Sequence, residues 1–176
     1  MIKRIAVFGA ESTGKSTLAA QLGARFQAPV AAEFVREFWD AHAGIIAAGD
    51  LDRIARGQME NEDRAVTQAA DVLICDTELL TNVLWADLLF PGQCPPWVRD
   101  EAERRCRHYA LYLLCDTDMP FVPDPQRCFP DPKDRARCRQ LWRETLTSRQ
   151  LPFVDIQGDW AVRGKIAIEA VVALAM

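Results

Sequence analysis

The sequence predicts an α/β fold in which a five-stranded parallel sheet lies between two layers of helices. Two observations lead to this class. Short and nearly continuous apolar runs, which are typical of strands buried on both faces, alternate along the chain with longer stretches of helical spacing. The first of these runs ends in a glycine-rich turn that opens a helix. Regular alternation of strands and helices is typical of three-layer domains with a parallel sheet.

The length and composition exclude several classes of protein. The chain has 176 residues, of which 49% are hydrophobic and 26% charged, with a formal net charge of −4. We therefore expect one domain over residues 1–176, with an ordinary core, and not a disordered chain. The mild acidity argues against a nucleic-acid partner, and no apolar run approaches the roughly 18 residues that span a membrane. A cytoplasmic protein is predicted, and its oligomeric state is left open.

Three strands are expected in the first half of the chain. The apolar run at residues 5–8 ends at Gly9, and helical spacing runs from Lys15 until Pro29. The elements expected after this helix are a weak strand at 30–32, helices at about 35–46 and 50–70, a clear strand at 72–75 and a helix at about 79–90.

Prolines divide the second half of the chain. Residues 118–132 hold five of the ten prolines together with several charged residues, and a segment this polar cannot be a core element. Long loops inside compact domains are usually functional or mobile, so we expect a proline-rich lid over about residues 118–139. The elements expected around it are a helix at about 98–107, strands at 109–115 and 153–156, and helices at 133–149 and about 160–175.

The glycine-rich turn has the spacing of a phosphate-binding loop. Gly9-Ala10-Glu11-Ser12-Thr13-Gly14-Lys15-Ser16 matches G-x-x-x-x-G-K-[ST], after a buried strand and at the start of a helix. Backbone N–H groups of such a loop point inward, and the helix N-terminus adds partial positive charge. Lys15 is expected to reach the β- and γ-phosphates of ATP, and the Ser16 hydroxyl to bind Mg²⁺. The alternative is a strand-to-helix turn that holds no ligand.

Asp76 ends the third expected strand at the edge of the sheet where the phosphate loop lies. Open α/β sheets bind ligands at this edge, so the Asp76 carboxylate can hold Mg²⁺ directly or through water. The alternative is a helix N-cap for the segment that begins near Thr77. Asp71, at the other end of the same strand, is a carboxylate to which we assign no function.

Glu33 follows the second expected strand and is predicted to project into the same crevice. A carboxylate opposite the γ-phosphate can take the proton from an attacking hydroxyl, and Arg36 can clamp anionic oxygens. The alternative is an acid at a helix start that forms an ion pair with Arg36 three residues later. Glu33 and Asp76 can also exchange the roles of base and metal ligand.

Arg127 lies in the proline-rich lid, where its side chain can swing onto the transferring phosphates. Arginine suits this role because its planar guanidinium makes bidentate contacts with phosphate oxygens. The basic residues of the helix that follows are expected mainly to form a solvated face, and the alternative is that one of them is functional. Lys15, Glu33, Asp76 and Arg127 are therefore the expected catalytic residues.

Five segments of the chain together resemble the motifs of one family. They are the loop at 9–16, Glu33-Phe34-Val35-Arg36-Glu37-Phe38, Asp76-Thr77, Asp124-Pro125-Gln126-Arg127 and Gly158-Asp159-Trp160-Ala161-Val162-Arg163. They are similar to motifs of the nicotinamide riboside kinase domain of NadR-type proteins and of related small AAA-type ATPases. In the same order, these motifs are G-x-E-S-[ST]-G-K-S, E-[YF]-x-R-E-[FY], D-T-[DE], D-x-x-R and G-[ST]-[YW]-x-x-R. The likeness covers about residues 3–174, and Pro125 and Asp159 depart from the pattern.

The resemblance implies a P-loop NTPase fold like that of nucleoside and nucleotide kinases. It also implies MgATP-dependent phosphorylation of a nucleoside hydroxyl, with nicotinamide riboside or a similar nucleoside as the acceptor. It places the turn at 158–163 near adenine, where Trp160 either offers a stacking face or packs in the core. Alternatives are a nucleotide-dependent ATPase or regulator without a small-molecule acceptor, and a kinase of a sugar or short-chain acid. The residues expected to bind nucleotide are Gly9, Glu11, Ser12, Thr13, Gly14, Lys15, Ser16, Thr17, Gly158, Trp160 and Arg163; those expected to bind the acceptor are Glu33, Arg36 and Asp76.

Overall fold

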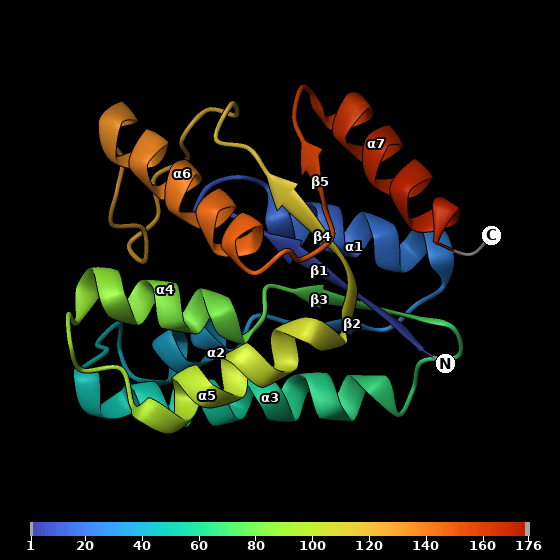
Figure 1. Ribbon diagram of the computed structural model, residues 1–176. Helices are drawn as coiled ribbons and strands as arrows, with labels where there is room; N and C mark the ends of the chain where they lie inside the picture. Colours follow the sequence, from blue (N-terminus) through green and yellow to red (C-terminus); the bar gives the residue numbers. More distant parts are fainter. Residues whose placement is uncertain (1, 175–176) are drawn as a thin grey trace.

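The computed structural model describes residues 2–174 and shows the expected alternation of strands and helices (Figure 1). The strands are β1 (Lys3–Phe8), β2 (Val30–Ala31), β3 (Val72–Asp76), β4 (Tyr109–Cys115) and β5 (Phe153–Ile156). The helices are α1 (Lys15–Phe26), α2 (Phe34–Ala41), α3 (Leu51–Val66), α4 (Leu79–Leu89), α5 (Pro96–Arg105), α6 (Pro132–Ser148) and α7 (Trp160–Ala173). Within residues 2–174, no helix has both the length and the apolar character needed to cross a membrane.

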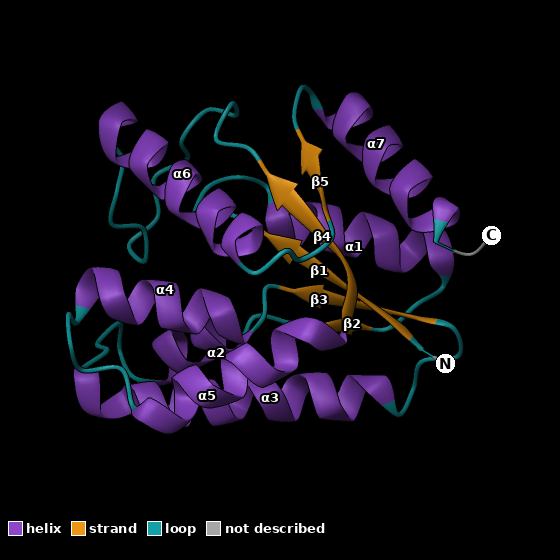
Figure 2. Ribbon diagram, viewed as in Figure 1, coloured by secondary structure: helices purple, strands orange, loops and turns teal. Residues whose placement is uncertain are grey.

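The five strands form one sheet in the order β2-β3-β1-β4-β5, and every neighbouring pair is parallel (Figure 2). The predicted parallel sheet is therefore confirmed. β1 is the central strand, and Val7 near its carboxyl end is the register partner of Asp76. This register brings the end of β3 beside the glycine-rich loop that follows β1, at the edge where open α/β sheets bind ligands.

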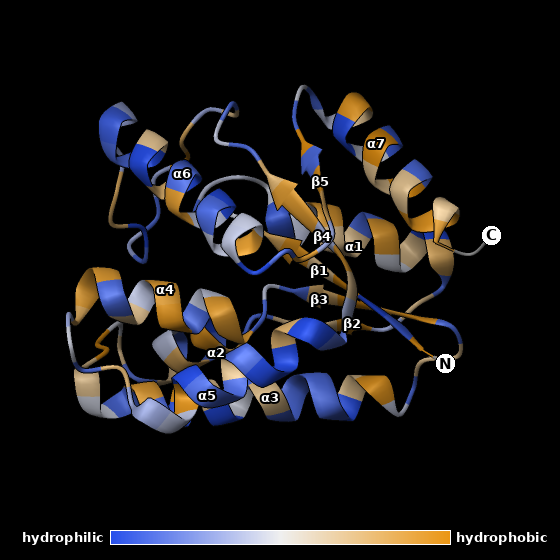
Figure 3. Ribbon diagram, in the orientation of Figure 1, coloured by the Kyte–Doolittle hydropathy of each residue, from blue (hydrophilic) through white to orange (hydrophobic). Residues whose placement is uncertain are grey.

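Helices cover both faces of the sheet, as the alternation of side chains along β1 requires. Ile5 and Val7 point into a core formed with α1 and α7, whereas Ala6 and Phe8 point into a core formed with α3, α4, α5 and α6. Figure 1 shows α1 and α7 on one side of the sheet and the other group opposite. Strands β3 and β4 consist mainly of hydrophobic residues, and α3, α5 and α6 contain many hydrophilic ones (Figure 3). This is the three-layer arrangement that the sequence predicts.

The second helix is shorter than its sequence pattern suggests. It ends at Ala41 because Ala43 and Gly44 take positive φ angles of 52° and 77°, and the N–H of Gly44 turns back to the carbonyl of Trp39 at 3.0 Å. Helical φ angles are negative, so these two residues end the helix. The third helix likewise ends at Val66 and not near residue 70, and the expected end of the last helix at 175 lies outside the described residues.

The segment expected as the lid, about 118–139, consists of an irregular loop followed by the start of the helix that the sequence also predicts at 133–149. The connection between β4 and α6, residues 116–131, has no helix or strand, and we call it the lid loop. Asp131 is the N-cap of α6 and accepts a hydrogen bond from the Lys133 N–H at 2.7 Å. Arg135, predicted on a solvated face, is buried and donates to the carbonyls of Thr117 and Met119 at 3.0 and 2.9 Å. It therefore ties α6 to the start of the lid loop.

Candidate active site

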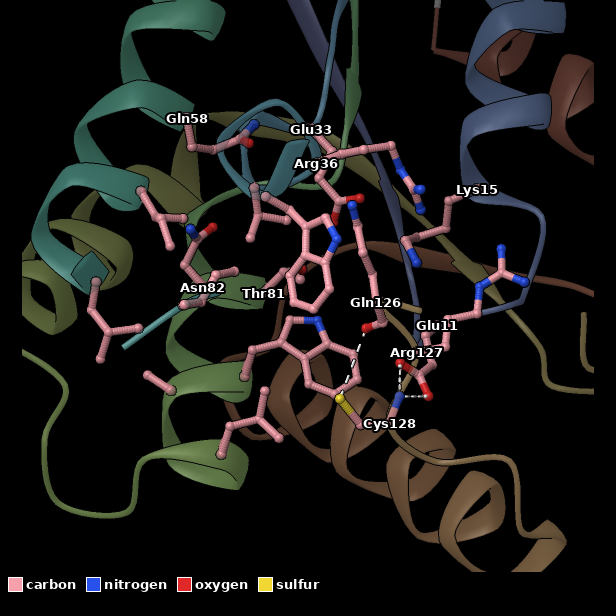
Figure 4. A pocket seen from close by; sticks show the side chains of 18 of the residues that line it. Glu11, Lys15, Glu33, Arg36, Gln58, Thr81, Asn82, Gln126, Arg127 and Cys128 are labelled. Atoms are coloured by element: carbon pink, nitrogen blue, oxygen red, sulfur yellow. Dashed lines mark hydrogen bonds between the residues drawn. The ribbon is translucent and has the colours of Figure 1, made fainter. Parts of the chain in front are cut away.

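A cavity of about 490 Å³ opens at the carboxyl ends of β1 and β3. One end is polar and is formed by the loop after β1, the start of α2 and the lid loop. The other end is apolar and is formed by side chains of α2, α3, α4 and α5. Figure 4 shows Glu33, Arg36 and Lys15 on one side of the space, with Thr81 and Asn82 of α4 on the other. A polar end joined to an apolar end suits a ligand that carries both phosphate and ring groups.

The loop after β1 has the backbone geometry of an anion cradle. Gly9 has a φ of +147°, and a Cβ at this position would lie 2.7 Å from the Cys115 carbonyl oxygen of β4. Ser12 and Gly14 also have positive φ angles, of 55° and 80°. These conformations curl the loop so that successive N–H groups turn toward one centre, at the N-terminus of α1. Glycine is required at residue 9 because β4 passes so close.

Lys15 and Thr13 meet inside the loop. The Lys15 Nζ and the Thr13 Oγ1 both donate to the Ala10 carbonyl at 2.8 Å. Thr13 is buried, so its hydroxyl braces the loop from within, whereas Lys15 lines the cavity. Ser16 and Thr17, in the first turn of α1, also line the cavity. The structure thus brings the expected phosphate-binding residues together.

Arg163 differs from its expected role as a nucleotide contact. It is 1% exposed, and its guanidinium donates to the carbonyls of Gly158 at 2.8 Å, Thr13 at 3.0 Å and Asp116 at 3.0 Å, and pairs with Asp118. All three nitrogens are thus engaged by protein groups. Arg163 therefore holds the phosphate loop against the end of β4, and its direct contact with nucleotide stays a prediction.

Trp160 lies beside the phosphate loop and not in the core. A Cβ at Gly14 would lie 2.6 Å from the indole Cη2, so the ring rests directly on this glycine, and the side chain remains 40% exposed. Asp159 accepts a hydrogen bond from the Val162 N–H at 2.9 Å and caps α7. The substitution of a carboxylate for the family's hydroxyl residue at this position therefore keeps the helix cap.

Glu33 stands at the N-cap of α2 with its side chain in the cavity. Burial raises the pKa of the Glu33 carboxyl above its ordinary value; Lys15 and Arg36 oppose this shift, and Asp76 adds to it. The expected alternative, an ion pair with Arg36, is absent from residues 2–174, because Arg36 pairs instead with Asp124 of the lid loop at 3.3 Å. Glu33 is thus left facing Lys15 and Asp76.

Asp76 fits a metal ligand better than a helix cap. It is 6% exposed, and its Oδ1 has no hydrogen-bond partner among residues 2–174. The cap of α4 is Glu78, so the alternative role considered for Asp76 is excluded. The described residues hold no cluster of three acidic, histidine or cysteine side chains arranged for a metal ion. Mg²⁺ commonly takes one or two protein ligands and completes its shell with water and substrate phosphates, so Asp76 and Ser16 fit this ion.

The lid loop is fastened to the phosphate loop by Glu11 and Ser12. The Glu11 carboxylate accepts the N–H groups of Cys128, at 2.9 and 3.0 Å, and Phe129, at 2.5 Å. Ser12 Oγ accepts the Val122 N–H at 2.9 Å and a guanidinium N–H of Arg127 at 3.3 Å. Figure 4 shows Glu11 and Arg127 side by side at the cavity. The geometry therefore brings Arg127 to the phosphate loop, as expected, and gives the side chain of Glu11 a contact with the lid.

The apolar end of the cavity contains functional candidates that sequence reasoning missed. Trp39 and Trp85 line it, and the Trp85 ring stacks on Phe129 of the lid loop with centroids 5.9 Å apart. Thr81 also lines it and has a buried hydroxyl without a partner among residues 2–174. Thr81 and Trp85 lie one turn apart on α4, whereas Trp39 belongs to α2, so only the folded chain brings Trp39 to the other two. The two tryptophans were the sole available indication, because aromatic side chains are enriched in binding pockets.

Glu78 is a second residue that the sequence reasoning left out. It is fully buried, and its carboxyl accepts the Leu80 N–H at 2.9 Å, while Oε1 has no partner among residues 2–174. Burial raises the pKa of Glu78 well above its ordinary value, and the hydrogen bond from Leu80 opposes the shift. Glu78 holds the first turn of α4, which carries Thr81 and Asn82 to the cavity.

Replacing Glu78 with glutamine is expected to stabilise the protein at alkaline pH. The folded-state pKa lies above the unfolded value of about 4.5, so the folded state binds this proton more tightly and the wild type loses stability as pH rises through the folded pKa. Glutamine keeps an acceptor for Leu80 and never ionises. In thermal melts, we expect the melting temperature of Glu78→Gln to exceed that of wild type by more at about pH 8 than at about pH 4.5. The exposed Glu60→Gln is the control, and an equal shift at both pH values would contradict the prediction.

Comparison with known proteins assigns the chain to a family. The model of the AAA domain family matches residues 4–163. The trifunctional NAD biosynthesis/regulator protein NadR of Escherichia coli (strain K12) is 28% identical over 160 residues, which cover 89% of this chain and 38% of that protein. The chain therefore spans well under half the length of this curated relative.

Solved structures support the same fold. NadR protein in complex with NAD and AMP-PNP has a TM-score of 0.74 at 22% identity, over 98% of this chain and 49% of that one. Deoxyadenosine kinase from M. mycoides with bound dATP has a TM-score of 0.63 at 10% identity, over 97% and 99%. The predicted P-loop kinase-like fold and the resemblance to NadR-type proteins are thus confirmed. Because the family match covers most of its length, the chain belongs to the AAA domain family.

Proposed function

We propose that the protein transfers the γ-phosphoryl group of ATP to a hydroxyl of a nucleoside, with nicotinamide riboside or a close analogue as the acceptor. One observation carries this proposal: Lys15, Glu33 and Arg127 line the same cavity, and this cavity continues into an apolar end with aromatic walls. The polar end suits the phosphates of ATP, and the apolar end suits the flat ring of an acceptor. The similarity to NadR supports the choice of nicotinamide riboside.

Positioning and charge neutralisation account for most of the proposed chemistry. The N–H groups of the loop at 9–16 hold the β- and γ-phosphates, and the Lys15 ammonium moves from the Ala10 carbonyl to the phosphate oxygens. Arg127 already contacts Ser12 of this loop, so a small rotation of its side chain brings the guanidinium onto the transferring group. Trp160, which rests on Gly14, supplies a stacking face for adenine.

Glu33 is proposed as the base and Asp76 as the metal ligand. Glu33 lines the cavity, where it can accept the proton of the acceptor hydroxyl, whereas Asp76 is buried beside the loop with one free oxygen. Ser16 and Asp76 would hold Mg²⁺, which when bound neutralises charge on the phosphate oxygens. The raised pKa of Glu33 moves the acidic limb of the activity profile to a higher pH than an ordinary carboxyl would give.

A panel of nucleosides with MgATP tests the proposal. ADP release should depend on the acceptor, and mass spectrometry should detect a nucleoside monophosphate as the product. We expect nicotinamide riboside to be among the best acceptors, and Lys15→Ala to release no ADP above background under the same conditions. ADP release at an equal rate with and without every nucleoside, sugar and short-chain acid would refute a kinase and favour an ATPase or regulator.

A further inference from the structure

Helix α3 contacts both chain neighbours of Glu33. The Asn61 side-chain amide donates to the Ala32 carbonyl at 3.3 Å, and the Gln58 Oε1 accepts the Phe34 N–H at 2.9 Å. Glu33 thus lies between two backbone groups that are held by side chains one turn apart on the same helix. Neither Gln58 nor Asn61 belongs to a motif, and neither follows a strand.

The side chain of Gln58 is itself held by a second hydrogen bond within α3. Its side chain is 1% exposed, and its amide nitrogen donates to Glu62 at 3.4 Å. Glu62, equally buried, accepts the Tyr109 hydroxyl at 2.6 Å, and Tyr109 begins strand β4. A continuous chain of hydrogen bonds therefore connects the central sheet to the start of α2. Because both ends of the Gln58 amide are engaged, its orientation has little freedom.

Close packing reinforces the same contact. A Cβ at Gly57 would lie 2.2 Å from the Phe34 ring, so the absence of a side chain at Gly57 lets this ring rest directly on α3. Helix α3 and the first residue of α2 are thus joined by a ring contact at Gly57 and a hydrogen bond at Gln58. The backbone on either side of Glu33 has little room to shift.

The hydrogen bond from Phe34 satisfies the first N–H group of α2 from outside the helix. The first N–H groups of a helix lack partners within it, and the N-cap side chain usually supplies one. Glu33 occupies the N-cap of α2 but makes no capping bond with its side chain. Gln58 accepts the first N–H group, that of Phe34, from another helix. The Glu33 carboxyl, which makes no capping bond, lines the cavity instead.

We propose that Gln58 and Asn61 are positioning residues that hold Glu33 in the geometry required to accept the proton of the acceptor hydroxyl. This inference rests on the proposed function. An error of about 1 Å in the position of a reacting group can cost on the order of 100-fold in rate. Loss of the Gln58 contact should therefore lower kcat about 10- to 100-fold. Because Gln58 also lines the cavity, the dependence of this loss on Glu33, and not the change in KM, identifies the positioning role.

A double-mutant cycle between Gln58 and Glu33 tests this coupling. Gln58→Met keeps the length of the side chain but removes the acceptor, and it is measured alone and combined with Glu33→Gln. If Gln58 acts through Glu33, its substitution should lower kcat about 10- to 100-fold in the wild-type background and less than about 3-fold once Glu33 is replaced. A merely structural role would lower kcat by the same factor in both backgrounds, and that result would overturn the inference.

Two further variants keep the test decisive. Asn61→Ala removes the more exposed of the two contacts and serves as the test if Gln58→Met does not fold. It should lower kcat several-fold, again only when Glu33 is present. Glu60→Met, on the exposed face of α3, is the matched control and should retain wild-type kcat. Wild-type protein without nucleoside-dependent turnover would refute the proposed function together with this inference. Turnover that is strongly lowered in Glu33→Gln but unchanged in Gln58→Met and Asn61→Ala would refute the inference alone.

Discussion

Replacing Lys15 with alanine is expected to lower nucleoside phosphorylation by at least about 100-fold, since a preorganised charge at the site of developing negative charge is commonly worth this much. The Lys15 ammonium is held at the mouth of the phosphate loop by one hydrogen bond to Ala10. The phosphate oxygens of ATP are stronger partners for the ammonium than this carbonyl. The ammonium stabilises the transition state more than the ground state, because negative charge moves onto the bridging oxygen during transfer. The measurement is kcat in a coupled ADP assay with saturating acceptor.

The variant should remain folded, which separates a catalytic loss from a structural one. Thr13 donates to the same Ala10 carbonyl, so this acceptor stays satisfied when the ammonium is removed. We expect a melting temperature close to that of wild type. Lys165→Ala removes an exposed lysine of α7 and is the matched control for loss of one positive charge. Near-wild-type turnover in Lys15→Ala would contradict the assignment of the loop.

Replacing Asp76 with asparagine is expected to weaken Mg²⁺ dependence and turnover together. A carboxylate that carries a free buried oxygen at the end of β3 supplies charge that an amide lacks. Loss of a metal-binding or metal-orienting group typically costs about 10- to 100-fold in metal affinity or activity. We therefore expect the Mg²⁺ concentration at half-maximal rate to rise about 10-fold or more, and kcat at fixed Mg²⁺ to fall by a comparable factor.

The same strand provides the control for this experiment. Asp71 precedes β3 at the opposite edge of the sheet and is exposed, so Asp71→Asn makes the same chemical change far from the cavity. It should leave both the Mg²⁺ dependence and kcat unchanged. If Asp76→Asn keeps the wild-type Mg²⁺ dependence while Glu33→Gln shifts it, the roles proposed for the two carboxylates must be exchanged.

Predictions that depend on neighbouring residues in the chain agree closely with the structure. The phosphate loop is such a case, because its conformation follows from glycines at 9 and 14 and from the helix that begins at Lys15. The order of strands and helices is another, since short apolar runs such as those of β3 and β4 alternate with stretches of helical spacing. Asp76 was placed correctly because any residue that ends a parallel strand beside β1 must lie at the loop.

Predictions that depend on distant partners were less complete. Arg163 was expected to touch nucleotide, yet its guanidinium is satisfied by Gly158, Thr13 and Asp116, which lie far apart in sequence. Arg135 was expected on a solvated face, but the start of the lid loop covers it. Neither outcome follows from spacing along the chain. In each case groups from other segments hold the guanidinium: two carbonyls for Arg135, and three carbonyls with the Asp118 carboxylate for Arg163.

The sequence by itself determined the three-layer fold, the phosphate loop and the carboxylates at the strand ends, because local spacing and apolar periodicity control where strands, turns and helices form. Tertiary structure alone decided which side chains surround the acceptor and which ones hold the catalytic groups. Trp39 of α2 and the pair Thr81 and Trp85 of α4 line one cavity only in the folded chain. Gln58 meets Phe34 only because α3 rests on the start of α2. Such contacts arise from the burial of helices against one sheet, which no short stretch of residues encodes.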